Sequence, residues 1–400
     1  MIRKLCHNWG LFIGGLILLV SACEVNQKDV QPSDEFVKIY NHPDEGISFY
    51  PVEVTEIEGS GFLILSGVKA DTSDIEFPVT HLVKTNTLGE VEWTADYPWL
   101  APAGIFNISG SVGFVAMDPQ LNAYAVQIDM SDGSEQSQHH LEIDMPLKTM
   151  VDANNNLVVL GYDYISRSSW VALFSTGFNI QSSTKLNVNA DLENQVQKHM
   201  NKTGQQFPFY IGQWSEGGQS GYFVNCFYNY SLRSVFLEGG LTLKGNIYSF
   251  QTEASLSSLQ QRLGNKYAMT RYYAGNNFLL GEVEVDINTS QNFNDVTGKV
   301  LNELTQNAKV LSERISIDAS EYILFTSQTN SNTVITYQHA AEADSLLATH
   351  VSQFNERIEV ADMIQTKDKG IAIIAQLYIL GKYKRPVLIK NPSSLYHQTD

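Results

Sequence analysis

One short pattern, repeated along the whole chain, constrains the fold more than any other feature. A turn residue is followed by a run of apolar, β-favouring residues, and seven copies begin at residues 61, 113, 156, 221, 277, 321 and 370. The mean step is about 51 residues, near the 40 to 50 residues of a propeller blade. A unit of this size cannot bury its apolar face alone, so the copies are expected to stack on one another.

Each apolar run has strand-like neighbours in the same order. Val52–Ile57 precedes the first run, and residues 81–93 supply two further strands around the turn Leu88-Gly89. Four strands in each of seven repeats predict an all-β fold, a seven-bladed β-propeller of four-stranded blades. The domain would span residues 34–400, with repeats starting near 51, 104, 147, 208, 267, 313 and 358. A twisted β-sandwich or a β-helix is the alternative.

The two ends of this array predict how the ring closes. The last repeat ends with a strand at 386–390 and leaves little chain for a fourth one, whereas the strand-like run 34–41 precedes the first repeat without a partner. We therefore expect an N-terminal strand within 34–50 to complete the last blade, since closure leaves no long edge exposed. The polar segments 191–202 and 255–263 are expected to be helical or irregular loop insertions.

The first thirty residues resemble an export signal. Arg3 and Lys4 precede an apolar run of ten residues, Leu11 to Val20, which is too short for a spanning helix of roughly 20 residues but suits a signal core. The run ends in Leu19-Val-Ser-Ala-Cys23, which resembles the bacterial lipobox. This predicts a signal peptide at 1–22, lipidation at Cys23 and a polar tether at 23–33. An ordinary signal peptide with a nearby cysteine, or an uncleaved anchor, is the alternative.

The lipobox and the first repeat together resemble secreted bacterial β-propeller lipoproteins. Their repeat has the form DGGYIIxG…xLxKTDxxGxxxW, and this chain has GFLILSG from Gly61 and HLVKTNTLGEVEW from His81. This chain lacks the double glycine and the Asp of that pattern, and the later copies keep little beyond hydrophobicity. The resemblance implies a propeller behind a fatty-acyl (palmitate) anchor in the cell envelope. Glu24 after Cys23 favours the outer membrane, and no activity is implied.

Charge and cysteine content exclude some classes of partner and bond. The chain has 26 Lys and Arg against 43 Asp and Glu, a formal net charge of −17, which disfavours nucleic acid as a partner. Cys6 would leave with the signal and Cys23 would be acylated, so Cys226 would have no partner for an intramolecular disulfide. We expect Cys226 to be a buried structural residue.

No sequence motif indicates a catalytic, metal or cofactor site. His139 and His140 are adjacent on a predicted strand and so point to opposite faces. The acidic turns 129–133 and 152–155 lack the further oxygen ligands of a calcium loop and are expected to be Asx turns. We therefore predict no metal site and no cofactor.

Aromatic residues and arginine gather where the second and third strands of several repeats are joined. In a propeller these loops open onto one face, and tyrosine with arginine is typical of contact surfaces. The alternative is that these rings cover strand ends and the seams between blades. The candidate ligand-binding residues are Tyr162, Tyr164, Tyr228, Tyr230, Arg233 and Tyr378.

These features favour a membrane-anchored binding or scaffolding module over an enzyme. The membrane would be contacted through Cys23, and the expected ligand is an envelope protein complex or a glycan. The alternative is a propeller-fold hydrolase or lyase acting on polysaccharide, because carboxylates can converge from different blades without leaving a sequence motif.

The anchor can be tested directly. Replacing Cys23 by Ser should abolish acylation and leave the precursor unprocessed, because the hydroxyl does not substitute for the thiol that receives the lipid. Labelled fatty acid supplied to growing cells measures this. Incorporation of label into the Cys23→Ser protein would contradict the lipobox interpretation.

Overall fold

The computed structural model describes residues 34–42, 46–70, 76–249, 254–294, 296, 298–379 and 383–397. The predicted signal peptide, Cys23 and the tether lie outside these residues. No helix in the described part of the chain is long and apolar enough to cross a membrane.

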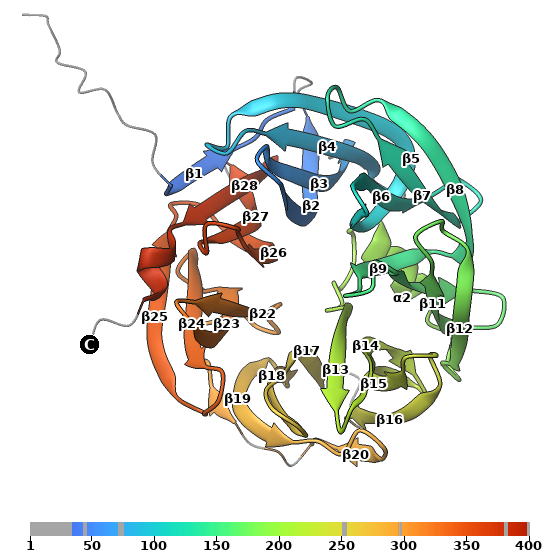
Figure 1. The fold of residues 1–400 in the computed structure, drawn as a ribbon, viewed down its shortest axis with the longest axis vertical. Helices are drawn as coiled ribbons and strands as arrows, with labels where there is room; N and C mark the ends of the chain where they lie inside the picture. Colours follow the sequence, from blue (N-terminus) through green and yellow to red (C-terminus); the bar gives the residue numbers. More distant parts are fainter. Residues whose placement is uncertain are drawn as a thin grey trace, which may run out of the picture. The chain divides into compact units, whose positions relative to one another are not determined.

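The described strands are arranged in a ring, and the innermost strand of each sheet lies nearest its centre (Figure 1). Almost all neighbouring strands are antiparallel; the short β20 pairs in parallel with β16. Going around the ring, the first sheet has the strands β2 (Ile47–Ile57), β3 (Gly61–Ala70), β4 (Val79–Thr85), β5 (Val91–Ile108), β6 (Ser111–Met117), β7 (Asn122–Ile128) and β8 (Glu135–Asp144).

Five compact blades follow this sheet. The first two are β9 (Pro146–Val151), β10 (Leu157–Asp163), β11 (Ser168–Phe174) and β12 (Ile180–Asn187), then β13 (Tyr210–Glu216), β14 (Gln219–Tyr228), β15 (Ser231–Glu238), β16 (Leu243–Tyr248) and β20 (Ser290–Asn292). The next two are β17 (Ala254–Gln261), β18 (Lys266–Tyr273), β19 (Asn276–Glu284) and β21 (Lys299–Val300), then β22 (Leu311–Ile317), β23 (Ser320–Gln328), β24 (Thr333–Ala340) and β25 (Leu346–Gln353). The last, called here the closing blade, is β26 (Ile358–Gln365), β27 (Ile371–Ile379), β28 (Tyr383–Asn391) and β1 (Phe36–Ile39).

The prediction of seven separate four-stranded blades is wrong. Within the described residues the strands form five separate blades and one continuous sheet of seven strands, β2–β8. The cause is β5, which runs for 18 residues and pairs with β4 through its first half and with β6 through its second. Its register shifts between Leu100 and Gly104, but the chain does not break, so the repeats that start near 51 and 104 share one sheet.

The apolar runs of the repeat form strands buried on both faces, because each is covered by strands of the neighbouring sheets. All seven residues of β10 are buried, and nine of the ten residues of β3. Outer strands instead alternate between exposed and half-buried residues, as in β12, because one face meets water. Six of the seven apolar runs are second strands of this kind. The run at Asn277 lies in β19, the third strand of its blade, so the repeat was placed one strand too late there.

The predicted closing strand is present. β1 pairs antiparallel with β28, with Phe36 opposite Lys390 and Ile39 opposite Val387. The strand thus joins the two ends of the described chain in one blade (Figure 1).

The two predicted insertions have different outcomes. The segment 191–202 contains the helix α2 (Glu193–Met200), which buries Val196 and Met200 against the β9–β12 and β13–β16 blades. The segment 255–263 is not an insertion, because β17 forms the innermost strand of a blade there. Its polar residues suggested an exposed loop, but Ser257 and Ser258 are buried within the blade. Ser257 is hydrogen-bonded to the Ala308 carbonyl, and Ser258 to the Thr270 hydroxyl. A short 3₁₀ helix, η2 (Ser393–Tyr396), follows β28.

Tyr40, immediately after β1, provides a test of the closure. Its ring is 4% exposed and packs with residues of both the closing blade and the β2–β8 sheet, and its hydroxyl donates a 3.1 Å hydrogen bond to the Gly89 carbonyl. Tyr40→Ala should lower the free energy of unfolding by about 3 to 5 kcal/mol, since a large buried ring is lost. Chemical denaturation measures this.

The matched control is Val37→Ala, because Val37 lies on the exposed face of β1 with 51% exposure. Its effect should stay within about 0.5 kcal/mol. Equal effects of the two substitutions would mean that Tyr40 does not join the two sheets.

Candidate functional site

The hairpins β10–β11 and β14–β15 meet at the seam between two adjacent blades. The Ser169 hydroxyl donates to the Phe227 carbonyl at 2.8 Å, and the Tyr230 amide donates to the Val188 carbonyl at 2.7 Å. The Val188 amide in turn donates to the Arg167 carbonyl at 3.0 Å. The segment after β12 therefore holds both hairpin loops, so Tyr164, Tyr228 and Tyr230 are brought together.

Tyr162 is not part of a contact surface, which corrects its sequence-based assignment. Its side chain is fully buried in β10, in the hydrophobic core shared by the two blades. A ring without exposed area cannot contact a ligand unless the blade opens. β10 is buried on both faces, so Tyr162 lies inside, whereas Tyr164, just beyond the end of β10, and Tyr228 are half-buried and pack on the edge of the same core.

Tyr230 and Ile165 are the exposed members of this region. Tyr230 is 62% exposed, and Ile165, in the other loop and not identified from the sequence, is 78% exposed. Asn229 and Tyr230 form a two-residue hairpin turn, and both have positive φ, +46° and +75°. We name the residues Tyr164, Ile165, Tyr228 and Tyr230 the seam surface.

Arg233 stabilises the hairpin beneath this surface. Its guanidinium donates to the Asn229 carbonyl at 2.8 Å and to Asn246 Oδ1 at 3.1 Å, and lies 5.6 Å from the centre of the Tyr228 ring. Because these contacts use the guanidinium internally, Arg233 positions the Tyr228 ring and the turn.

Tyr378 is not brought to the seam surface. It lies on β27 in the closing blade, away from β10 and β14 across the ring (Figure 1). Its hydroxyl donates a 2.9 Å hydrogen bond to Glu359, and the Arg357 guanidinium lies 4.7 Å from its ring centre.

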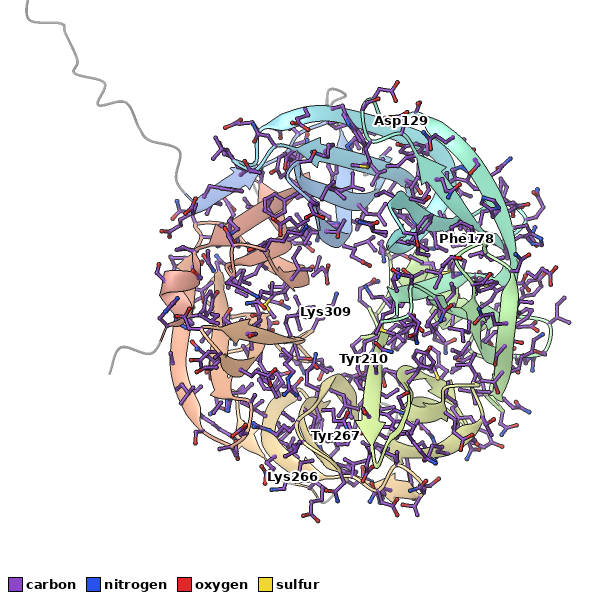
Figure 2. All side chains as sticks on the ribbon, in the orientation of Figure 1. Asp129, Phe178, Tyr210, Lys266, Tyr267 and Lys309 are labelled. Carbon is purple, nitrogen blue, oxygen red and sulfur yellow. The ribbon has the colours of Figure 1, made fainter. Side chains whose placement is uncertain are left out.

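A second group of polar side chains lies near the centre of the ring. Lys148 on β9 forms a 3.0 Å ion pair with Glu53 on β2, and Asp362 on β26 accepts a 3.1 Å hydrogen bond from the Val54 amide. Lys309, labelled in Figure 2 near the middle of the ring, donates to the Ala361 carbonyl. Because the innermost strands converge there, charged side chains of the β2–β8 sheet, the β9–β12 blade, the β22–β25 blade and the closing blade interact. We call the full set the central cluster: Glu53, Lys148, His199, Lys202, Lys309, Glu313 and Asp362.

The surrounding protein changes the proton affinities of this cluster. Desolvation raises the pKa of Glu313 to about 8 and that of Glu53 to about 7. The positive charge of Lys148 opposes the rise at Glu53, and the negative charge of Asp362 adds to the rise at both groups. Desolvation lowers the pKa of Lys202 and of Lys309 to about 8. Carboxyl and ammonium groups that titrate near neutrality can exchange protons with a bound molecule.

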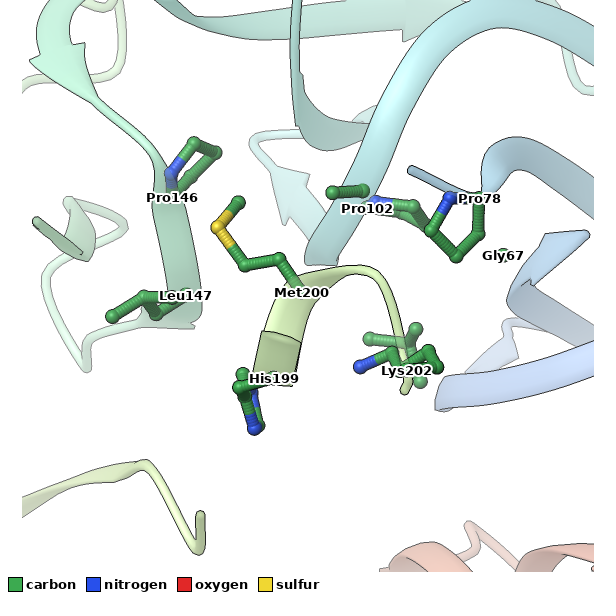
Figure 3. A pocket seen from close by; sticks show the side chains of 10 residues that line it. Gly67, Pro78, Pro102, Pro146, Leu147, His199, Met200 and Lys202 are labelled. Atoms are coloured by element: carbon green, nitrogen blue, oxygen red, sulfur yellow. The ribbon is translucent and has the colours of Figure 1, made fainter. Parts of the chain in front are cut away.

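The end of α2 contributes His199 and Lys202 to the cluster. The Phe207 amide donates to His199 Nδ1 at 3.0 Å, and burial holds the pKa of this imidazole well below its usual range. Lys69 on β3 donates to the Asn201 carbonyl at 2.7 Å, which fixes the turn after α2. His199, Met200 and Lys202 line a shallow pocket together with Pro78, Pro102 and Pro146 (Figure 3).

The central cluster was missed from the sequence because its members are spread between residues 53 and 362. The usable signal is local: Glu53, Lys148, Glu313 and Asp362 are charged residues inside strands that are otherwise rich in apolar residues.

Two other sequence-based expectations are confirmed. The acidic turn at 152–155 is an Asx turn, since Asp152 Oδ1 accepts hydrogen bonds from the amides of Asn154 and Asn156, each at 2.8 Å. Cys226 is a free thiol with no exposed area.

The titration of Glu313 gives a pH-dependent prediction. Between its ordinary pKa of 4.5 and the folded value of about 8, the folded chain holds a proton that the unfolded chain has lost, so stability falls as pH rises through this range. Glu313→Gln removes that titration. The free energy of unfolding of the variant, relative to wild type, should rise from pH 4.5 to 8 and then level off, as measured by urea denaturation at each pH.

The exposed carboxylate Glu284 on β19 provides the control. Glu284→Gln should leave the pH dependence of wild type unchanged. A Glu313→Gln difference that is constant with pH would contradict the assigned environment.

Comparison with known proteins supports the fold. No family model and no curated protein matches the sequence. The WD40 propeller domain of Doa1 is similar at 10% identity, with 89% of this chain and 96% of that domain covered and a TM-score of 0.50. BamB from Moraxella catarrhalis is similar at 9% identity, with 85% of this chain and 99% of the BamB chain covered and a TM-score of 0.41. The ring of sheets and the likeness to the Doa1 domain together make this chain a β-propeller.

Proposed function

We propose that this propeller is a binding or scaffolding module of the bacterial cell envelope, anchored to the outer membrane by lipid on Cys23, which binds a protein partner through the seam surface. The anchor rests on the lipobox-like sequence Leu19–Cys23 and on the charged and apolar parts of the segment before it. Two or three acyl chains give stable membrane attachment.

The exposure of Ile165 and Tyr230 is the observation that carries the binding role. Both side chains keep most of their apolar area in water, at 78% and 62% exposure, although they stand on loops fixed by backbone hydrogen bonds. Burying such area contributes roughly 25 cal/mol per Å² to association. A preorganised aromatic side chain also loses little conformational entropy on binding.

The surroundings of the seam surface favour a protein partner. Tyr164 and Tyr228 extend the apolar area next to the two exposed residues. Arg167, 58% exposed at its side chain, forms only a long 3.3 Å ion pair with Asp191 at the edge. An apolar, aromatic centre with a polar rim is the usual anatomy of a protein–protein contact.

A second function is catalysis on a polysaccharide, and the central cluster is the observation that favours it. Glu53, with its pKa raised to about 7 by desolvation, and Asp362, whose pKa desolvation also raises, are two neighbouring carboxyl groups. A pair of this kind can act as general acid and general base. The central cluster contains both acidic and basic side chains, which also suits it to holding a small charged molecule.

The seam surface is tested by the double substitution Ile165→Ala and Tyr230→Ala. We expect recovery of a partner from detergent-solubilised membranes to fall at least about tenfold, because the central apolar contacts of an interface carry most of its binding energy. The unfolding midpoint should stay unchanged, since both side chains are exposed.

Leu263→Ala is the matched control, because Leu263 is 79% exposed on the hairpin between β17 and β18, a connection of the first two strands. Such hairpins lie at the opposite end of the blade from those joining the second and third strands. Equal partner recovery by wild type and the double variant would contradict the proposal. Polysaccharide turnover that Glu53→Gln abolishes and the double variant keeps would support the second function instead.

A further inference from the structure

Two histidines and an aspartate from separate segments meet beside the closing blade. His42 lies three positions after the end of β1, His81 lies on β4, and Asp96 lies on β5. One ligand atom from each residue lies within 4.8 Å of the others. The group therefore joins the chain leaving the closing strand to two strands of the β2–β8 sheet.

The aspartate is placed between the two imidazoles. Asp96 Oδ1 lies 2.7 Å from His81 Nδ1, and Asp96 Oδ2 lies 3.3 Å from His42 Nε2. The centres of the two imidazole rings are 5.5 Å apart. Phe49 packs against both, with ring-centre distances of 5.1 Å to His81 and 6.0 Å to His42, and so limits their rotation.

Burial leaves one face of this group open to solvent. The side chains of His42 and His81 are 6% and 2% exposed, whereas Asp96 is 53% exposed. His81 Nε2 is buried and has no hydrogen-bond partner among the described residues. A buried polar atom without a partner is uncommon and points to a further interaction at that ring.

We propose that His42, His81 and Asp96 form a binding site for a divalent transition-metal ion of the zinc type, with a fourth position open to solvent through the exposed side of Asp96. Two neutral imidazoles and one carboxylate are a donor set that suits Zn²⁺, whereas Ca²⁺ and Mg²⁺ prefer oxygen ligands throughout. This site departs from the sequence-based expectation of no metal, because residues 42, 81 and 96 share no motif spacing.

The location gives the metal a structural consequence. His42 is separated from β1 by only two residues, so an ion held by all three side chains ties the closing strand to the β2–β8 sheet. An ion that binds only this folded arrangement stabilises it in proportion to its occupancy. The closure of the ring would then depend on both the β1–β28 ladder and the metal.

The test uses the purified full-length chain, freed of metal by chelator and titrated with ZnCl₂ in a calorimeter. We expect one equivalent to bind and the unfolding midpoint to rise with added Zn²⁺. His42→Ala and Asp96→Asn should each weaken binding at least about tenfold, since even outer partners of a metal contribute about that much. Co²⁺ in place of Zn²⁺ should give the visible absorption bands of a low-coordinate site in wild type and not in these two variants.

His397→Ala is the matched control. His397 also pairs with an aspartate, Asp318 at 3.0 Å, but has no second histidine beside it among the described residues. This variant should bind Zn²⁺ as wild type does. Asp96→Asn keeps the size of the side chain, and its metal-free unfolding midpoint shows whether it is folded. The proposal is overturned if wild type binds no stoichiometric Zn²⁺, or if the folded Asp96→Asn protein binds it with unchanged affinity.

Discussion

The pairing of β1 with β28 is the contact on which the rest of the structure depends. A ring of sheets is stable only if its last blade has a neighbour on both sides and no long strand edge in water. Here four residues, Phe36 to Ile39, complete the blade, and Tyr40 then packs into the apolar cluster shared with the first sheet. The same stretch follows the tether predicted from the sequence, so any force transmitted by a lipid anchor would reach the strand that closes the ring.

Convergence of the innermost strands explains why charged residues gather at the centre. Lys309 lies near the middle of the ring (Figure 2), and Lys148 on β9 reaches Glu53 on β2 across the boundary between two sheets. Glu53 forms an ion pair with Lys148, whereas desolvation raises the pKa of Glu313 and of Asp362. The fold thus places titratable groups together without requiring them to be close in sequence.

The sequence predicted the all-β class, the repeat and the closing strand because all three depend on local hydrophobic patterns. It failed at β5, because this strand continues through Pro98, Pro102 and Gly104, residues that usually interrupt a strand. It also failed at Asn277, since the true second strand, β18, begins at Lys266 and carries polar residues within its buried face.

Tyr162 and Tyr164 have the same residue type two positions apart, and only the end of β10 at Asp163 explains why one is fully buried and the other half-buried. The central cluster and the His42–His81–Asp96 group depend on contacts across sheets, which no pattern in one segment contains.

The turn Asn229-Tyr230 bears on the binding role proposed for the seam surface. A two-residue hairpin with positive φ at both positions is normally made by Asn-Gly, because a bulky residue in the left-handed region is disfavoured by about 1 kcal/mol. Tyr230 occupies that position at φ +75°, with its ring 62% exposed and its amide bonded to Val188. The ring contributes little to the core, so packing does not account for the strain. The proposed contact with a partner would use this arrangement, because the turn fixes the ring in place before binding and Arg233 holds the turn from beneath.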